Sequence, residues 1–499
     1  MKRTAAILIL TASGCAATCA SGASSPAAAA AEEQLGLWHI AGQLWKNPAV
    51  NQWRMSAGIT RVGAGYSNRS EKSGDCDPRF GSGDAFWSAG ADTYTKYRSS
   101  TLWGSARYTN GKTEDMLWNE TADYDIVYPY VLADSVGGDM KREVYAFAGG
   151  YADRRGRWAW GAEMSYRATL EYRDVDPRPK NVVGCLDIAV GGAFNLARDY
   201  YAGISFNFRK YKQDNDIDFK SEMGNDKIFH LTGMGTDYHR FAGTGHDTYY
   251  DGYRYGLTAD FAPASGSGAF ASVDISRFTF DNILSEYNKL PMASAWHNSI
   301  GVRAGWLNRP AHSYWGVAMS VAAYRRHGTE NIFGDPAGGI YPQVGANAMY
   351  ADNDTQASLD GMWGTTWGSA GRVAVSGGAG WQRRITSYMD PWRQSETKAV
   401  TAHAGAGAYV PLSGGWLLSA DAGISYRRPY GCRYVHTPGG NTETAALQAI
   451  ERQAFDRAAQ TRTQARAGVA VARTFGKYLG RIAGDIDYRT YSVSISLIF

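Results

Sequence analysis

The chain is built from short stretches in which apolar and polar residues alternate. The clearest covers residues 158–173, where the apolar set is Trp158, Trp160, Ala162, Met164, Tyr166, Ala168, Leu170 and Tyr172. The residues between them are Ala159, Gly161, Glu163, Ser165, Arg167, Thr169, Glu171 and Arg173. A period of two is typical of a β-strand with one apolar and one polar face. Aromatic residues near the ends of the apolar face favour a strand whose outer face meets lipid and whose inner face meets a wet lumen.

The same alternation recurs at residues 200–209 and 416–427. Each stretch is about ten residues, the length that a tilted strand needs to cross a bilayer. A single stretch of this kind would also fit a soluble β-sandwich, but the recurrence with aromatic ends favours the membrane. Glycine and alanine fill most inward positions of residues 400–410 and 465–472, so we expect free space in the lumen.

Connections between the stretches alternate between short and long. Short turns are expected near residues 97–101, 153–157, 196–199, 263–268, 308–312, 369–371, 411–415 and 475–477. Long polar connections are expected at residues 112–140, 213–248, 327–353 and 428–462. In bacterial barrels the short turns face the periplasm and the long loops face outside. Residues 442–463, rich in Ala, Gln and Glu, predict a helix in the last long loop.

The C-terminus alternates in the same way and ends in Phe499. This ending resembles the signal that outer-membrane barrels present to their assembly machinery, so we assign Phe499 as the assembly signal.

Segments counted from Trp53 give 16 strands through Ala472. A two-residue turn at Arg489 and Thr490 would explain the switch of apolar parity there and raise the number to 18. A bulged single strand is the alternative, and 16 strands remain if residues 85–97 lie outside the wall. The prediction is an all-β, transmembrane antiparallel β-barrel of about 16–18 strands, with short periplasmic turns and long extracellular loops.

The N-terminus has the pattern of a secretory signal. Lys2 and Arg3 precede an apolar stretch and a run of small residues that ends at Ala31. We expect cleavage after Ala31, with a lipoprotein signal at Cys15 as the alternative. The chain then divides into a signal peptide (1–31), a short periplasmic N-terminal segment (32–51) and an outer-membrane barrel (52–499). A first strand so close to the mature N-terminus leaves no room for the plug domain of an energised receptor.

Composition excludes several other classes of protein. The sequence has no apolar run of the roughly 20 residues that a membrane-spanning helix needs. The formal net charge is +4 with both signs interleaved, so we expect no nucleic-acid partner. Cys76, Cys185 and Cys432 are far apart in sequence and lack metal-ligand spacing, so we expect no metal and no cofactor.

Two longer segments carry a resemblance to a family. Residues 118–139, WNETADYDIVYPYVLADSVGGD, and 165–181, SYRATLEYRDVDPRPKN, resemble an uncharacterised family of Bacteroidota outer-membrane β-barrels, and the resemblance runs along most of the mature chain. It implies a multi-pass β-barrel in the outer membrane of a Gram-negative cell. The family has no established activity, so function stays open.

A shorter motif precedes the first strand. Residues 44–50, LWKNPAV, resemble the Asn-Pro-Ala segment near the start of fatty-acid-transporter-like barrels. We interpret it as a turn, because Asn-Pro is a common turn former.

Inward-facing charges are the candidate lumen-lining residues. They are Glu163, Arg167, Glu171, Asp187, Arg209, Asp421 and Arg427. Charges of both signs could set up a transverse field that acts on polar solutes. They could equally neutralise one another in a closed barrel.

One short motif raises the question of catalysis. His297, Ser299 and Gly301 form a His-x-Ser-x-Gly pattern that resembles the catalytic strand of outer-membrane phospholipase. Alternation places His297 and Ser299 in the lumen, away from lipid, and Ile300 stands where that family has Asn. We therefore expect no catalytic residues and no enzyme activity.

The predicted function is a porin-like passive channel or transporter for small molecules. The alternative is a non-transporting surface scaffold or adaptor that binds a lipoprotein, another barrel or an extracellular ligand, because the loops are long and the loop at residues 124–130 is aromatic. The expected partners are outer-membrane lipid, the barrel-assembly machinery and periplasmic chaperones.

Overall fold

The computed structural model describes residues 25–71, 76–196, 199–221, 227–241, 243, 247–310, 312–368, 370–437 and 442–499. The residues before Ser25, which include Cys15 and most of the predicted signal peptide, lie outside this description.

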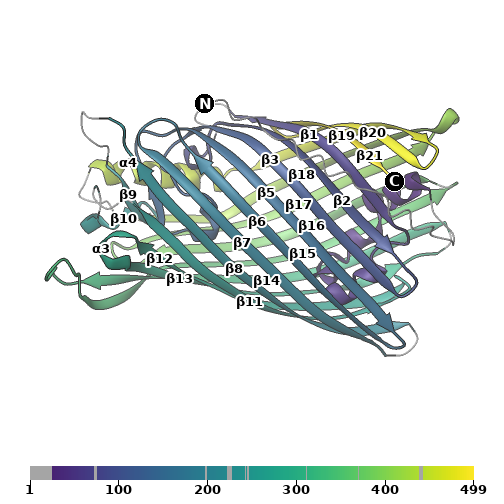
Figure 1. Ribbon diagram of the computed structural model, residues 1–499, viewed down its shortest axis with the longest axis horizontal. Helices are drawn as coiled ribbons and strands as arrows, with labels where there is room; N and C mark the ends of the chain where they lie inside the picture. The colour runs from purple at the N-terminus through teal and green to yellow at the C-terminus, as the bar shows by residue number, and fades with distance from the viewer. Residues whose placement is uncertain are drawn as a thin grey trace, which may run out of the picture.

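The wall is a closed antiparallel barrel of 18 strands (Figure 1). The strands are β1 (Ile59–Ser70), β2 (Gly83–Lys96), β3 (Ser100–Met116), β5 (Gly138–Arg155), β6 (Trp158–Tyr172), β7 (Arg178–Asn195), β8 (Tyr200–Asp218), β11 (Thr248–Pro263), β12 (Gly268–Leu284), β13 (Leu290–Asn308), β14 (Ser313–Phe333), β15 (Gln343–Trp367), β16 (Gly371–Tyr388), β17 (Arg393–Pro411), β18 (Trp416–His436), β19 (Arg462–Phe475), β20 (Tyr478–Asp487) and β21 (Thr490–Ile498). Consecutive wall strands pair, and β1 also pairs with β21, which closes the barrel.

Alternation sorts the side chains of the wall as predicted. On β6, Trp158 and Met164 are 64% and 57% exposed on the outer face, whereas Ala159 and Glu171 are buried inside. The prediction of 18 strands is confirmed, and residues 85–97 belong to the wall through β2. The final turn lies one residue earlier than predicted, because Asp487 is paired with Thr490.

The two ends of the barrel differ as the connection lengths predict. All of the short turns expected from the sequence lie at one end, here the short-turn end. Two of the expected long loops are shorter than predicted. In one, β14 continues to Phe333 and β15 already begins at Gln343; in the other, β18 continues to His436. These strands keep pairing beyond the predicted limits, so the wall is taller there.

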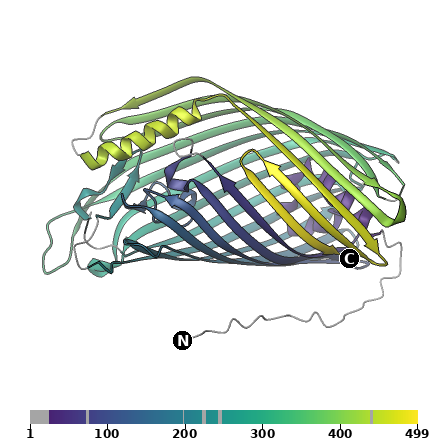
Figure 2. The same cartoon turned by 90° about the horizontal axis from the view of Figure 1, so that it is seen from above.

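Long loops fold back into the opposite end (Figure 2). The connection from β3 to β5 contains α2 (Tyr124–Val127) and β4 (Val131–Ala133), which pairs with β9 (Phe229–Gly233), and β9 pairs with β10 (Thr236–Asp237). We name residues 118–134, which contain α2 and β4, together with β9 and β10, the loop plug. Its buried residues pack on inward side chains of β7, β8 and β11–β13, and on Leu447 of α4 (Thr442–Ala458). The predicted helix in the last long loop is therefore present.

The N-terminal segment lies inside the short-turn end. It contains α1 (Pro26–Leu35) and the 3₁₀ helices η1 (Leu37–His39), η2 (Gly42–Lys46) and η3 (Pro48–Trp53). Its apolar side chains share one buried cluster with wall residues such as Tyr201 and Phe270. We name residues 25–54 the N-terminal plug. The sequence predicted a short periplasmic segment at residues 32–51; in the structure these residues lie within the short-turn end of the wall, as the end of α1 and three 3₁₀ helices. The predicted boundaries at residues 31 and 51 stay predictions.

The remaining helices are short. They are α3 (Glu286–Lys289), η4 (Pro78–Phe80), η5 (His239–Phe241) and η6 (Ser413–Gly415). In the part of the chain that the structure describes, no helix has both the length and the apolar character needed to cross a bilayer.

Candidate functional site

Three glycines form the floor on which the N-terminal plug rests. Gly161, Gly191 and Gly203 lie on the inner faces of β6, β7 and β8. A Cβ atom at Gly161 would lie 2.6 Å from the backbone of Pro48, and one at Gly191 would lie 2.1 Å from Oδ1 of Asn47. Any side chain at these positions would therefore displace the plug.

Asn47 attaches the plug to this floor and to the neighbouring strand β11. Its Nδ2 donates to Asp260 at 3.0 Å (Oδ1) and 3.1 Å (Oδ2), and to the carbonyl of Gly192 at 3.3 Å. Its Oδ1 accepts from the backbone N–H of Ala49 at 3.0 Å and so caps η3, whose first residue is Pro48. The Asn-Pro-Ala segment is a turn, as interpreted from the sequence, but a buried one inside the lumen.

Charged pairs fix the plug at its edges. Lys46 contacts Asp274 of β12 at 2.8 Å, and Arg61 of β1 contacts Glu33 of α1. Arg303 of β13 donates from Nε to the carbonyl of Ile40 at 2.8 Å. The plug is thus tied to strands on several sides of the barrel.

The loop plug has its own buried anchor. Nη2 of Arg173 contacts Glu120 at 2.9 Å and Asp134 at 2.6 Å, and all three side chains are buried. Burial, with help from the neighbouring Asp134, raises the pKa of Glu120 well above its usual value. Burial alone would raise the pKa of Asp134 too, but its hydrogen bonds and the Arg173 charge lower it overall. Arg173 thus lies between two carboxyl groups whose pKa values are shifted in opposite directions.

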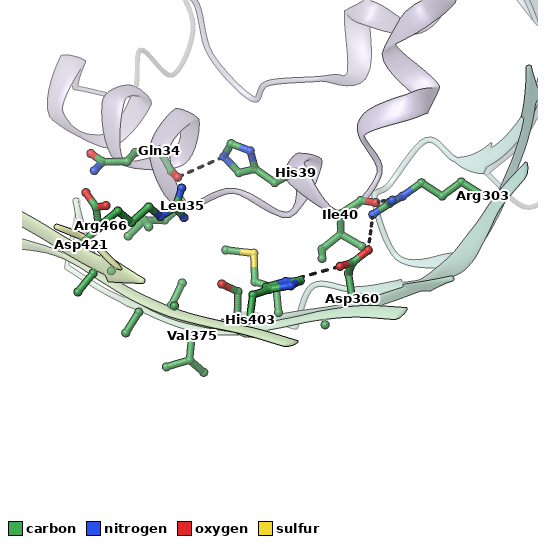
Figure 3. A pocket seen from close by; sticks show the side chains of 18 residues that line it. Gln34, Leu35, His39, Ile40, Arg303, Asp360, Val375, His403, Asp421 and Arg466 are labelled. Carbon is green, nitrogen blue, oxygen red and sulfur yellow. Dashed lines mark hydrogen bonds and ion pairs between the residues drawn. The ribbon is translucent and has the colours of Figure 1, made fainter. Parts of the chain in front are cut away.

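A first cavity of about 570 Å³ lies between the N-terminal plug and the wall from β13 to β19 (Figure 3). Asp360 lines it, with Arg303 at 3.7 Å and His403 at 3.6 Å. His39 of the plug bonds the carbonyl of Gln34 at 3.2 Å, within its own segment. Both signs of charge line this cavity, so it fits polar solutes without a clear preference for one sign.

A second cavity of about 740 Å³ lies between the loop plug and the wall from β1 to β8, β20 and β21. Its charged lining residues are Arg61, Asp92, Arg107, Arg167, Asp187, Arg209 and Arg481. We name this cavity the arginine chamber. A smaller cavity of about 390 Å³ shares Asp187 and Arg209 with it and adds Lys46, Glu163, Arg254 and Asp274.

The predicted lumen-lining residues divide into two groups. Glu163, Arg167, Asp187, Arg209 and Asp421 line one or more of these cavities. Trp103 Nε1 donates to Glu163 at 2.6 Å. Arg167 already contacts Asp123 of the loop plug at 2.5 Å.

Two other predicted residues serve the structure instead. Glu171 is buried against Arg142 of β5. Arg427 donates to the carbonyl of Ala458 at 2.7 Å and so holds the end of α4. Neither residue lines one of the three cavities described above.

His297 and Ser299 face the lumen but have separate partners. His297 Nδ1 lies 3.2 Å from Nη2 of Arg326, and Ser299 Oγ lies 2.8 Å from Oγ of Ser276. Each side chain is therefore engaged with a neighbouring strand, and the arrangement gives Ser299 no activating base among these contacts.

Several important residues escaped the sequence reasoning. Asn47 and Asp260 are 213 positions apart, and only their joint inward orientation could have suggested contact. Arg254, Arg107 and Arg481 also face the lumen by alternation, and a complete parity assignment of β3, β11 and β20 would have found them.

The chain belongs to the family described as "Family of unknown function (DUF6850)", whose model matches residues 48–498. The expectation of an uncharacterised family is thus met. No curated protein matches the chain.

Among solved structures, the barrel is similar to several receptors at low identity. The ferric enterobactin receptor PfeA of Pseudomonas aeruginosa is 7% identical, with 89% of this chain and 81% of that chain covered and a TM-score of 0.39. The siderophore receptor PirA of Acinetobacter baumannii is 7% identical, with 89% and 80% covered and a TM-score of 0.39. The import receptor Fiu of E. coli K12 is 9% identical, with 89% and 82% covered and a TM-score of 0.37. Their ligands are properties of those receptors alone.

Proposed function

We propose that the protein is an outer-membrane transporter that passes small polar solutes through its lumen when the N-terminal plug moves. The apolar outer face of the wall suits lipid. We infer that the short-turn end faces the periplasm and the loop plug faces outside, because short turns face the periplasm in bacterial barrels. Solutes move passively, down their gradient, through the two larger cavities.

The seat of the N-terminal plug carries this proposal. Directly beneath Asn47 and Pro48 the wall consists of small residues, namely Gly161, Gly191 and Gly203 with alanines such as Ala159 and Ala193, whereas larger side chains such as Tyr201 and Phe270 pack against other parts of the plug. Interdigitated side chains would lock this part of the plug, whereas small residues with a few polar anchors let it leave its seat when the hydrogen bonds of Asn47 break. A plug used only to fill space would need no hydrogen-bonded Asn47 at its centre.

Single-channel conductance in a planar bilayer tests the proposal. Gly191→Ala places a methyl group against Asn47 and should convert rare openings into a steady conductance. Gly192→Ala is the matched control, because Gly192 is the next residue, on the outer face, where a Cβ atom meets nothing closer than 3.8 Å. Equal currents from both variants and the wild type would contradict a gate at this seat.

A second candidate, a surface scaffold, rests on a different part of the molecule. The hairpin of β14 and β15 exposes Ile332, Ile340 and Val344 at the long-loop end. An apolar hairpin tip of this kind suits a surface lipoprotein or another barrel. Val344→Ser should then abolish cross-linking to that partner and leave conductance unchanged, whereas a transporter alone predicts no cross-link. Assembly machinery, chaperones and a Bacteroidota cell remain predictions from the sequence.

A further inference from the structure

Two neighbouring arginines on the lumen wall share one carboxylate as their ion-pair partner. Arg254 of β11 and Arg209 of β8 are directly opposite each other in the antiparallel register. Like charges directly opposite one another in a sheet destabilise it. One carboxylate serves both, because Oδ1 of Asp187 lies 2.7 Å from Nε of Arg209 and 3.7 Å from Nη2 of Arg254.

The guanidinium of Arg254 has a donor that lacks a hydrogen-bond partner among the described residues. This donor is Nε, which is buried. The side chain of Arg254 is nevertheless 33% exposed, toward the cavity that it lines. A buried donor without an acceptor costs free energy, so an acceptor brought by a ligand would be stabilised here.

The arginine chamber, which shares Asp187 and Arg209 with the cavity that Arg254 lines, also has an excess of positive charge. Five arginines and two aspartates line it. Arg61 and Arg167 are paired with acids of the two plugs, and no ion pair joins Arg107 or Arg481 to any described residue. Arg107 is opposite Gly90 on one side and Ala146 on the other, so its guanidinium projects over a floor of small residues.

The floor itself offers neutral hydrogen-bond donors. Ser88, Ser105, Ser165, Ser494 and Ser496 line the chamber together with glycines. Guanidinium forks combined with hydroxyl groups bind planar or tetrahedral oxyanions well. A volume of about 740 Å³ is in the range of small-molecule sites.

We propose that a small, multiply charged oxyanion binds where the arginine chamber and the smaller cavity share Arg209, with Arg254 on the side of the smaller cavity and Arg107 and Arg481 on the side of the chamber. The shared chemistry is that of a polycarboxylate or a phosphorylated solute. This proposal rests on the proposed function only in naming the solute class, because binding itself needs no transport.

Thermal unfolding of the full-length, detergent-solubilised barrel tests the site. The probes are citrate and pyrophosphate, each added at constant ionic strength against sodium chloride, and glucose is the neutral comparison. A ligand that binds only the folded state raises the unfolding temperature in a saturable way. A larger effect of citrate would identify a carboxylate site, and a larger effect of pyrophosphate a phosphate site; either supports the proposal.

Two lumen variants give opposite expectations. Arg254→Gln should weaken binding about tenfold or more, because it removes a charge-assisted hydrogen-bond donor. Asp187→Asn should strengthen binding, because it removes the competing carboxylate. Arg428→Gln is the charge-matched control on β18, since Arg428 lines none of these cavities, and it should bind like the wild type. Arg254→Lys keeps the charge and gives an intermediate affinity if Arg254→Gln does not fold.

The failures of the two proposals are distinguishable. A shift that does not saturate, or one equal in the wild type and Arg254→Gln, would overturn the anion site. Solute passage through Gly191→Ala without any anion binding would leave the transporter intact and refute the site. Saturable binding that depends on Arg254, in a barrel that never conducts, would leave the anion site intact and refute the transporter.

Discussion

Removal of the Asn47 side chain should release the N-terminal plug from the wall. In Asn47→Ala, buried Asp260 loses its two contacts with Nδ2, at 3.0 and 3.1 Å, and η3 loses its cap. Hydrogen bonds to a charged group contribute about 1.5–3 kcal/mol. A helix cap contributes about 1 kcal/mol. The plug's seated state should therefore weaken by about 3 kcal/mol, which corresponds to an increase on the order of a hundredfold in the released population.

Hydrogen exchange followed by mass spectrometry measures this release. Peptides from residues 37–53 should exchange on the order of a hundredfold faster in Asn47→Ala. Peptides from the wall strands should be unchanged, because their ladder hydrogen bonds do not involve the plug. Asn68→Ala, on the outer face of β1, is the control for loss of an asparagine. Unchanged exchange in residues 37–53, or equal acceleration of the wall, would refute the claim that Asn47 holds the plug.

Three further outcomes follow from the structure. In contrast to the cleavage after Ala31 expected from the sequence, the burial of Ala27, Ala29, Ala30 and Ala31 in the lumen predicts a mature protein that begins before Pro26. Intact mass measures this, and a mature chain that starts at Glu32 would contradict it. Because burial raises the pKa of Glu120, its neutral form stabilises the loop plug fully below its usual pKa, and this contribution is lost as pH rises through the raised pKa. Glu120→Gln should remove that loss, seen as protection of residues 118–134 against hydrogen exchange, relative to the unfolded chain at the same pH, that no longer falls as pH rises; a fall equal to that of the wild type would assign the effect elsewhere. Phe499→Ala should lower the amount of folded barrel in cells but not its refolding in detergent, because its backbone bonds with Thr60, at 2.7 and 2.8 Å, remain; equal losses in both would make Phe499 a stability residue instead of an assembly signal.

Local patterns were enough to predict the wall. The alternation of residues 158–173 becomes β6 because a strand sends successive side chains to opposite faces, and each face meets one solvent. The turn between β20 and β21 followed from the switch of parity near Tyr488. Such features depend on neighbours in sequence, which is why they can be read from one chain.

The lumen could not be predicted in the same way. The contact between Asn47 and Asp260 depends on where the plug settles on the wall from β6 to β11, and the small residues at Gly161 and Gly191 look like free space in the sequence. The opposition of Arg209 and Arg254 depends on the register of β8 and β11, which a long intervening loop leaves undetermined. Glu171 faces inward as predicted, yet its burial against Arg142 depends on the loop plug above it.

The most direct test of a lumenal route is the entry of a small labelled solute into liposomes that contain the full-length protein. We expect slow solute entry for the wild type and for Gly192→Ala, and fast entry for Gly191→Ala, because only the inner-face methyl group displaces the N-terminal plug. Slow entry in all three, with hydrogen exchange showing that the plug has left its seat in Gly191→Ala, would contradict passage through the lumen.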